Sequence, residues 1–135
     1  MREILFRGKR VDNGEWIEGY FLPGNERQSL HPCIFVYLPE TQSFECFDID
    51  IDTLGEYTGV KDKNGTRIFE GDIIKVLLSG NPQPIGVVKY GVTGICGFCV
   101  MTERGYSNYV LDKSEYFEVI GNIHDNPELL KGERK

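Results

Sequence analysis

Four cysteines are the side chains of this 135-residue sequence that could most readily do chemistry. Cys96 and Cys99 have the spacing of a redox pair, which needs its first thiolate at the N-terminus of a helix, where the helix dipole lowers the thiol pKa. Residues 94–101 instead have the composition of a strand, and strand residues three apart point to opposite faces. We therefore expect these two cysteines to be ordinary apolar thiols.

A zinc site is the second chemistry that the cysteines could support. Structural zinc takes four ligands, normally supplied as two close pairs on turns. The other candidates are His31, Cys33 and Cys46, and the spacing of His31 and Cys33 is atypical for such a pair. We expect no bound metal, and predict buried thiols and a surface histidine in its place.

Three alternating aspartates, Asp48, Asp50 and Asp52, resemble the start of a calcium loop. Such a loop needs a glycine at its sixth position and a glutamate at its twelfth, where this sequence has Thr53 and Gly59. The alternation of aspartate with apolar residues over 47–52 favours a half-buried strand with one acidic, solvated face.

Catalytic constellations are not recognisable in the sequence. Neither His31 nor His124 lies in the context of a nucleophile and its base, and no glycine-rich phosphate loop opens a helix. We therefore expect no catalytic residue, no cofactor and no enzymatic activity.

The charge of the chain disfavours nucleic acid as its partner. Fifteen basic residues stand against 21 acidic ones, which gives a formal charge of −6 and a pI near 4.9, and the basic residues are scattered. The alternative is a nucleic-acid-associated barrel that stacks bases on four aromatic residues, which only Lys89 and Arg104 flank with positive charge. Those aromatic residues would be Tyr90, Phe98, Tyr106 and Tyr109.

Membrane and secretory signals are not found either. No apolar run approaches the ~20 residues that cross a bilayer, and the N-terminal residues do not form the apolar stretch of a secretory signal. We expect a cytoplasmic protein whose cysteines are thiols, and whose acidic surface suits a protein partner. Self-association stays open.

The elements that must position these residues are β-strands. Alanine is absent, and the apolar residues are mainly of the β-favouring types. Short strands are predicted at 15–22, 33–38, 47–52, 73–78, 85–90, 95–103, 109–111 and 117–123, with residues 55–59 leading into a turn. Asn126 and Pro127 can start a single helical turn.

Turn glycines are the structural residues that the sequence singles out. Gly14 and Gly65 each follow an asparagine, and Asn-Gly accepts the positive φ of a tight hairpin turn. Gly71 lies where Glu70-Gly71-Asp72 must bend into the next strand. The predicted core contains Trp16, Ile73, Val76, Val87 and Val119, with Ile74 and Lys75 on opposite faces of their strand.

Three blocks of the sequence resemble the YopX family of phage and prophage proteins. The central block is Tyr57-Thr58-Gly59-Val60-Lys61-Asp62-Lys63-Asn64-Gly65 and its continuation from Ile68 to Val76. The flanking blocks are residues 6–20 and 119–130. The resemblance implies a small protein of a phage, prophage or similar element, similar in fold to SH3-like barrels with an added N-terminal β segment. It brings no activity and no catalytic residue.

These observations predict an all-β protein: an SH3-like small barrel with an added N-terminal β segment and a short C-terminal helical turn. Residues 1–55 are assigned to the N-terminal segment packed on the barrel, 56–130 to the barrel and 131–135 to a polar tail. The predicted function is that of a non-enzymatic phage or prophage accessory protein, a small β binding module that contacts a protein of the host or phage.

Overall fold

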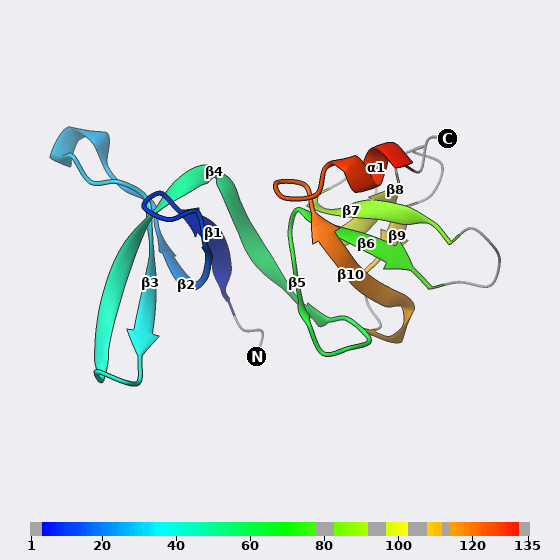
Figure 1. Ribbon diagram of the computed structural model, residues 1–135, viewed down its shortest axis with the longest axis horizontal. Helices are drawn as coiled ribbons and strands as arrows, with labels where there is room; N and C mark the ends of the chain where they lie inside the picture. The colour runs from blue at the N-terminus through cyan, green and yellow to red at the C-terminus, as the bar shows by residue number, and fades with distance from the viewer. Residues whose placement is uncertain (1–3, 78–82, 92–96, 103–107, 112–113, 133–135) are drawn as a thin grey trace. The chain divides into compact units, whose positions relative to one another are not determined.

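The computed structural model of the chain describes residues 4–77, 83–91, 97–102, 108–111 and 114–132, and nearly all of its regular structure is β (Figure 1). The chain divides into two compact units, residues 1–57 and residues 58–135. The all-β prediction is confirmed. The finer assignment of an SH3-like small barrel stays a prediction, as does the packing of the N-terminal segment on it.

The first unit contains β1 (Phe6–Arg10), β2 (Trp16–Leu22), β3 (Cys33–Leu38) and most of β4 (Ser43–Lys61). Each strand pairs antiparallel with the next, and β1 also pairs with β4 through Lys9 opposite Asp50 and Arg7 opposite Gly55. The strands therefore curl until the first meets the last. A short 3-10 helix, Glu26–Gln28, lies between β2 and β3.

A bulge in β4 makes this curl. The Lys9 N–H donates to Thr53 Oγ1 at 2.9 Å, and the Thr53 hydroxyl donates to the Asp50 carbonyl at 2.6 Å. The register between β1 and β4 shifts at this point, and such a bulge bends its strand and increases its twist.

The interior of the first unit is small. Ile34 and Ile49 are its most deeply buried aliphatic side chains. A β-carbon at Gly8 would lie 2.8 Å from Ile49 Cδ1, and one at Gly19 would lie 2.9 Å from Ile34 Cγ2 and 2.4 Å from the Phe35 carbonyl oxygen. The backbone therefore passes directly over these two isoleucines, which leaves room for few other side chains.

The second unit is built on a five-stranded antiparallel sheet in the order β10-β6-β7-β8-β9. These strands are β6 (Asp72–Val76), β7 (Ile85–Tyr90), β8 (Phe98–Thr102), β9 (Asn108–Val110) and β10 (Phe117–Asn122). The end of β4 pairs with β5 (Arg67–Phe69). A 3-10 helix, Ser114–Tyr116, precedes β10, and α1 (Glu128–Gly132) follows it.

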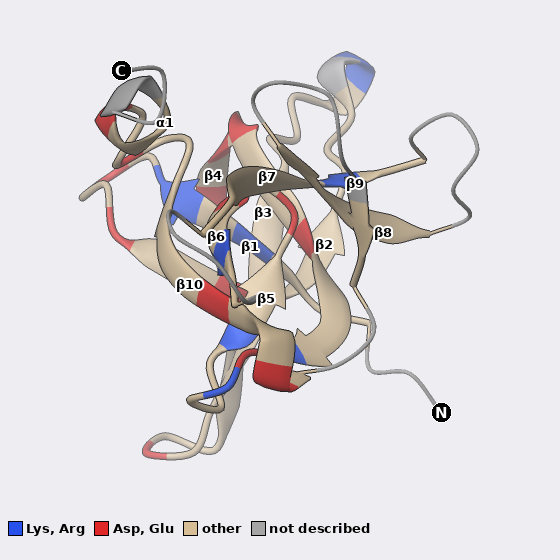
Figure 2. Cartoon of the chain, turned by 90° about the vertical axis from the view of Figure 1, so that its right-hand side faces the viewer, with Lys and Arg blue, Asp and Glu red and all other residues tan. Residues whose placement is uncertain are grey.

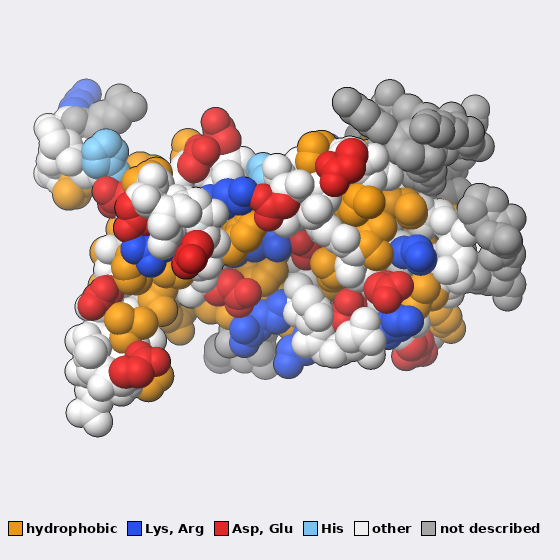
Figure 3. All heavy atoms as spheres, viewed as in Figure 1, with side chains coloured by type: hydrophobic (Ala, Val, Ile, Leu, Met, Phe, Trp, Pro, Cys, Tyr) orange, Lys and Arg blue, Asp and Glu red, His pale blue; other side chains and the backbone are white. Residues whose placement is uncertain are grey.

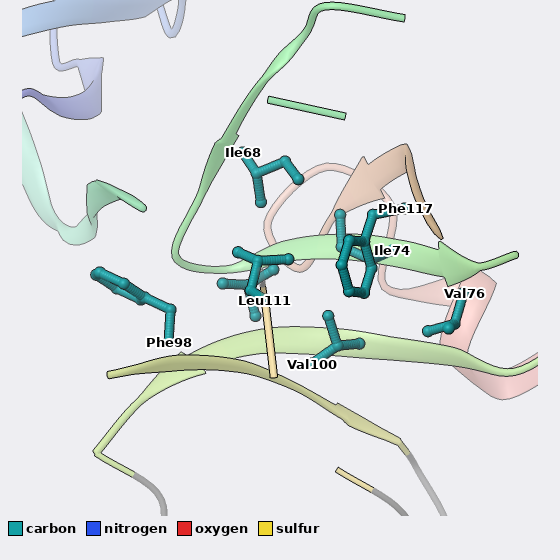
Figure 4. Packing of buried hydrophobic residues seen from close by; sticks show 8 residues of the cluster. Ile68, Ile74, Val76, Phe98, Val100, Leu111 and Phe117 are labelled. Carbon is teal, nitrogen blue, oxygen red and sulfur yellow. The ribbon is translucent and has the colours of Figure 1, made fainter. Parts of the chain in front are cut away.

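One apolar cluster fills this unit (Figure 4). Side chains from β5 to β10 meet in it, and Val60, Tyr109 and Val119 pack against it. Its buried members are Ile68, Ile74, Val76, Val88, Phe98, Val100, Leu111 and Phe117.

The structure corrects the predicted core and one predicted strand. Ile73 and Val76 are buried as predicted, but Trp16, Val87 and Val119 are only half-buried. The predicted strand 47–52 is the middle of β4, which is longer than expected because residues 55–59, predicted only to lead into a turn, belong to the same strand. Gly55 and Gly59 lie inside this strand, where a glycine marks irregularity and not an end.

Candidate functional site

The outward side of the first unit carries a row of large apolar side chains across three strands. Tyr20 on β2 is opposite Phe35 on β3, and Phe35 is opposite Cys46 on β4. The opposed pair Leu22 and Cys33 lies on one side of these residues, and the opposed pair Tyr37 and Phe44 lies on the other. Side chains directly opposite each other share one face of a sheet. We call this set the aromatic face: Tyr20, Leu22, Phe35, Tyr37 and Phe44.

The aromatic face is open to solvent and internally packed. Phe44 is 56% exposed, and Tyr20, Leu22 and Tyr37 are exposed as well. The rings of Phe35 and Phe44 are stacked, with centroids 5.0 Å apart and planes 3° apart, and the Tyr37 ring lies 5.1 Å from that of Phe44. Contacts of this kind hold the rings in place while their outer surfaces stay uncovered.

Part of this face projects as a hairpin (Figure 1). β2 is in register with β3 only from Cys33 to Phe35, whereas β3 and β4 stay paired as far as Leu38 opposite Ser43. The Tyr37 and Phe44 pair therefore lies on a two-stranded extension, where approach by another molecule meets little obstruction.

Acidic side chains border the aromatic face. Asp48 is opposite Cys33, Glu18 precedes Tyr20 by two residues on β2, and Asp50 follows Asp48 by two on β4, so all three share the outward side. All three are exposed. Hydrophobic, acidic and basic side chains are intermixed on the surface in view in Figure 3. On β1, Arg7 is opposite Glu18 and Lys9 is opposite Asp50. The border of this apolar patch is therefore charged, with Asp48 as its acidic side chain without a cation directly opposite.

Cys33 and Cys46 meet within this outward side, and the register of β3 and β4 brings them together. Their Sγ atoms are 2.9 Å apart. Cys33 is buried, but Cys46 is exposed, so the prediction of buried thiols is wrong for Cys46. The pKa of Cys33 is raised to about 11. Burial is the largest cause, and the hydrogen bond with Cys46 and the charges of Cys46 and Asp48 add smaller contributions.

Trp16 is the first residue of β2 and lies on the same outward side, opposite Lys9 of β1. The Arg7 guanidinium carbon lies 4.6 Å from the centroid of its ring, and Lys9 Nζ lies 5.5 Å from it. Both distances are within the range of cation–π attraction. The prediction of Trp16 as a core residue is wrong because its neighbours on β1 are two cations and not apolar side chains.

The aromatic residues of the nucleic-acid alternative do not form an open stacking surface in the described residues. Tyr90 is 57% exposed, but the ring of Phe98 is buried and meets Tyr90 edge-on at 4.9 Å. Tyr109 packs against the apolar cluster. Tyr106 and Arg104 lie outside the described residues. Basic residues are dispersed among acidic ones along the chain (Figure 2).

The three turn glycines have positive φ, at +72° for Gly14, +85° for Gly65 and +92° for Gly71. Around Gly65 and Gly71 there is no crowding: a β-carbon would meet nothing within 4 Å at Gly65 and nothing within 3.8 Å at Gly71. Backbone conformation, and not space, is therefore the reason for glycine at these two turns.

Two buried carboxylates, which the sequence did not single out, organise the same segment. Asp62 Oδ1 accepts the Asn64 and Thr66 N–H groups, each at 2.9 Å, and Asp62 Oδ2 accepts the Val119 N–H at 3.0 Å. Asp72 Oδ2 accepts the Phe69 N–H at 2.8 Å. An aspartate two residues before a turn is a signal for this arrangement. Both are used to hold backbone groups.

The remaining candidate ligands are dispersed. Asp48, Asp50 and Asp52 are exposed as predicted, and His31 is exposed too. Cys99 is buried, which raises its pKa, and Cys96 lies outside the described residues. In the described ranges, no three His, Cys, Asp or Glu side chains are grouped as metal ligands would be. No helix among those residues is long and apolar enough to cross a membrane.

A family model and a solved structure match nearly the whole chain. The model of the family described as YopX protein matches residues 5–131. The crystal structure of protein EF1440 from Enterococcus faecalis is similar to this chain, with a TM-score of 0.58 and 26% sequence identity, over 96% of this chain and 99% of that one. No curated protein matches the sequence.

Proposed function

The chain belongs to the YopX protein family, and we propose that it is a non-enzymatic binding module that contacts a protein partner through the aromatic face. The observation that supports this is a set of exposed aromatic side chains held together by ring contacts on one side of one small unit. Aromatic residues are enriched at the centres of protein interfaces.

The chemistry of the face favours a partner with an apolar surface surrounded by basic residues. Glu18, Asp48 and Asp50 border the patch, Arg7 and Lys9 on β1 lie opposite Glu18 and Asp50, and the whole chain carries a formal charge of −6. Complementary charges at the rim speed encounter and select among partners, while buried aromatic groups supply affinity.

The resemblance to the YopX family also suggests where the protein acts and what kind of partner it has. As an accessory protein of a phage or prophage, the chain would act in the cytoplasm of a bacterial host, and its partner would be a host or phage protein. The turn segment 62–72, with its two buried carboxylates bonded to backbone N–H groups, fits a structural role.

The test is capture of proteins from host lysate by the tagged full-length chain, with and without nuclease. The informative variant is Phe44→Ser, because Phe44 contacts both Phe35 and Tyr37. Tyr90→Ser is the matched control, since Tyr90 is 57% exposed against 56% for Phe44 and lies in the other unit. We expect Phe44→Ser to weaken capture by about tenfold or more, and raised salt to weaken it further.

Three results decide the proposal. A protein that survives nuclease, is lost with Phe44→Ser and is kept with Tyr90→Ser supports it. Equal capture by the wild type and Phe44→Ser would show that the aromatic face is not the contact surface. Loss of all capture after nuclease would point to the nucleic-acid alternative.

A further inference from the structure

We propose that Cys33 and Cys46 form a reversible intramolecular disulfide, which makes the outward side of the first unit a site of thiol oxidation. Their Sγ atoms are 2.9 Å apart, and a disulfide needs about 2.05 Å, so the sulfurs have less than an ångström to close. The proposal concerns the chemistry of this pair and stands independently of any partner.

The register of two strands creates the pair. Cys33 is opposite Asp48 on β4, and Cys46 is two residues before Asp48, so the two cysteines lie diagonally across neighbouring strands on one face. Diagonal neighbours on adjacent strands are within reach of each other's side chains. The cysteines are 13 residues apart in sequence.

Their different exposure assigns each a separate step. Cys46 is exposed, and its thiolate can attack a sulfur of a low-molecular-weight disulfide, forming a mixed disulfide and expelling one thiolate. Cys33 is buried beside it, and its thiolate then attacks Cys46 Sγ and expels the second thiolate. Two protein thiols are oxidised to one disulfide, the small disulfide is reduced to two thiols, and these take up the two protons released.

The proposed order predicts which thiol reacts first with an alkylating agent. Cys33 is opposite Asp48 on β4 and Leu22 on β2 and lies beside the Cys46 thiol. Burial is the largest cause that raises its pKa to about 11, and Cys46 and then Asp48 add to it. At about pH 8 little of it is thiolate, so iodoacetamide should modify Cys46 at least about tenfold faster than Cys33 in the folded, reduced protein. Alkylation of Cys33 should accelerate as the pH rises towards 11.

The deciding experiment treats the reduced full-length protein with oxidised glutathione and measures its intact mass. We expect a loss of about 2 Da, two hydrogen atoms, with no bound glutathione at the end. Trypsin leaves both cysteines in one peptide, residues 28–61. Further cleavage after Glu40 and Glu45 separates the backbone around Cys33 from that around Cys46, and the two cysteine-containing peptides should stay linked by the disulfide. Cys46→Ser should show no loss, and Cys99→Ala, which removes a buried thiol elsewhere, should still form the bond.

The other outcomes overturn the proposal. Glutathione retained on Cys46 would show that Cys33 does not complete the exchange. A disulfide within residues 90–104 would assign the oxidation to other thiols, and a disulfide between two chains would show that the bond is not intramolecular. Unchanged mass in excess oxidant would show that the pair does not react. Because the wild type alone distinguishes these outcomes, the test holds even if a variant fails to fold.

Discussion

Gly65 is a residue whose role follows from backbone geometry alone. Its φ of +85° lies in the left-handed region, and nothing lies within 4 Å of the place where a side chain would begin. Any loss of stability on substitution therefore reports the cost of the backbone conformation, without a contribution from crowding.

We expect Gly65→Val to lower the free energy of unfolding by about 1–3 kcal/mol, because a β-branched residue is strained at positive φ. Urea denaturation monitored by circular dichroism measures it. Gly65→Asn is the matched control and should cost less, since asparagine tolerates this region better. Equal losses for the two variants would remove backbone strain as the explanation.

At the residue scale, sequence reasoning found the turns and missed the contacts. Asn-Gly at 13–14 and 64–65 is a local signal, so Gly14 and Gly65 could be named without the fold. The Cys33 and Cys46 pair depends on which residues of β3 and β4 are opposite each other, and a shift of one residue would separate the thiols to different faces. Asp62 reaches Val119, 57 residues further along the chain.

At the scale of elements, Asp62 joins a hairpin turn to a distant strand. It is buried, with one oxygen holding the turn after β4 and the other holding β10 at Val119. Without this carboxylate, three backbone N–H groups lose a charged acceptor, and only those of the exposed residues Asn64 and Thr66 lie where water readily replaces it, whereas Val119 is half-buried.

We expect Asp62→Ala to lower the free energy of unfolding by about 2–4 kcal/mol, for this reason. Asp52→Ala, at an exposed carboxylate on β4, should change it by less than about 0.5 kcal/mol. Chemical denaturation of both variants checks the pair. Similar small effects for the two would mean that water replaces the Asp62 carboxylate at no cost.

Strand prediction succeeded where the pattern is local. Residues 33–38 form an unbroken apolar run and are β3, and the alternation at 47–52 lies within β4. The full length of β4 was hidden because Gly55 and Gly59 have the composition of turn residues. Gly55 is opposite Arg7 on β1, and the end of β4 pairs with β5, so partners from other parts of the chain keep these residues within the strand although Gly59 has a φ of +88°.

At the scale of the whole molecule, β4 is common to both units. It begins at Ser43 in the first unit and ends at Lys61 in the second, beyond the division at residue 57. A unit of this size buries a small share of its surface, and this one has few deeply buried side chains. We infer that the first unit depends on the continuation of β4 for part of its stability.

The fragment 1–57 should therefore unfold at a lower temperature than the same residues do in the full chain, by roughly 10 °C or more. Trp16, the single tryptophan, reports the unfolding of this unit by its fluorescence in both proteins. An equal midpoint for fragment and full chain would show that the first unit is stable on its own.

The hydrogen bonds of the two Asn-Gly turns also affect how the protein ages. Asparagine before glycine is prone to deamidation, in which the glycine nitrogen attacks the asparagine side chain and a succinimide forms. Here the Gly14 N–H donates to the Arg10 carbonyl at 2.9 Å and the Gly65 N–H to the Asp62 carbonyl at 3.0 Å, so each nitrogen is held by the fold. Conversion of these asparagines to acidic residues then requires the turn to open, and its accumulation over storage would record how often each hairpin does so.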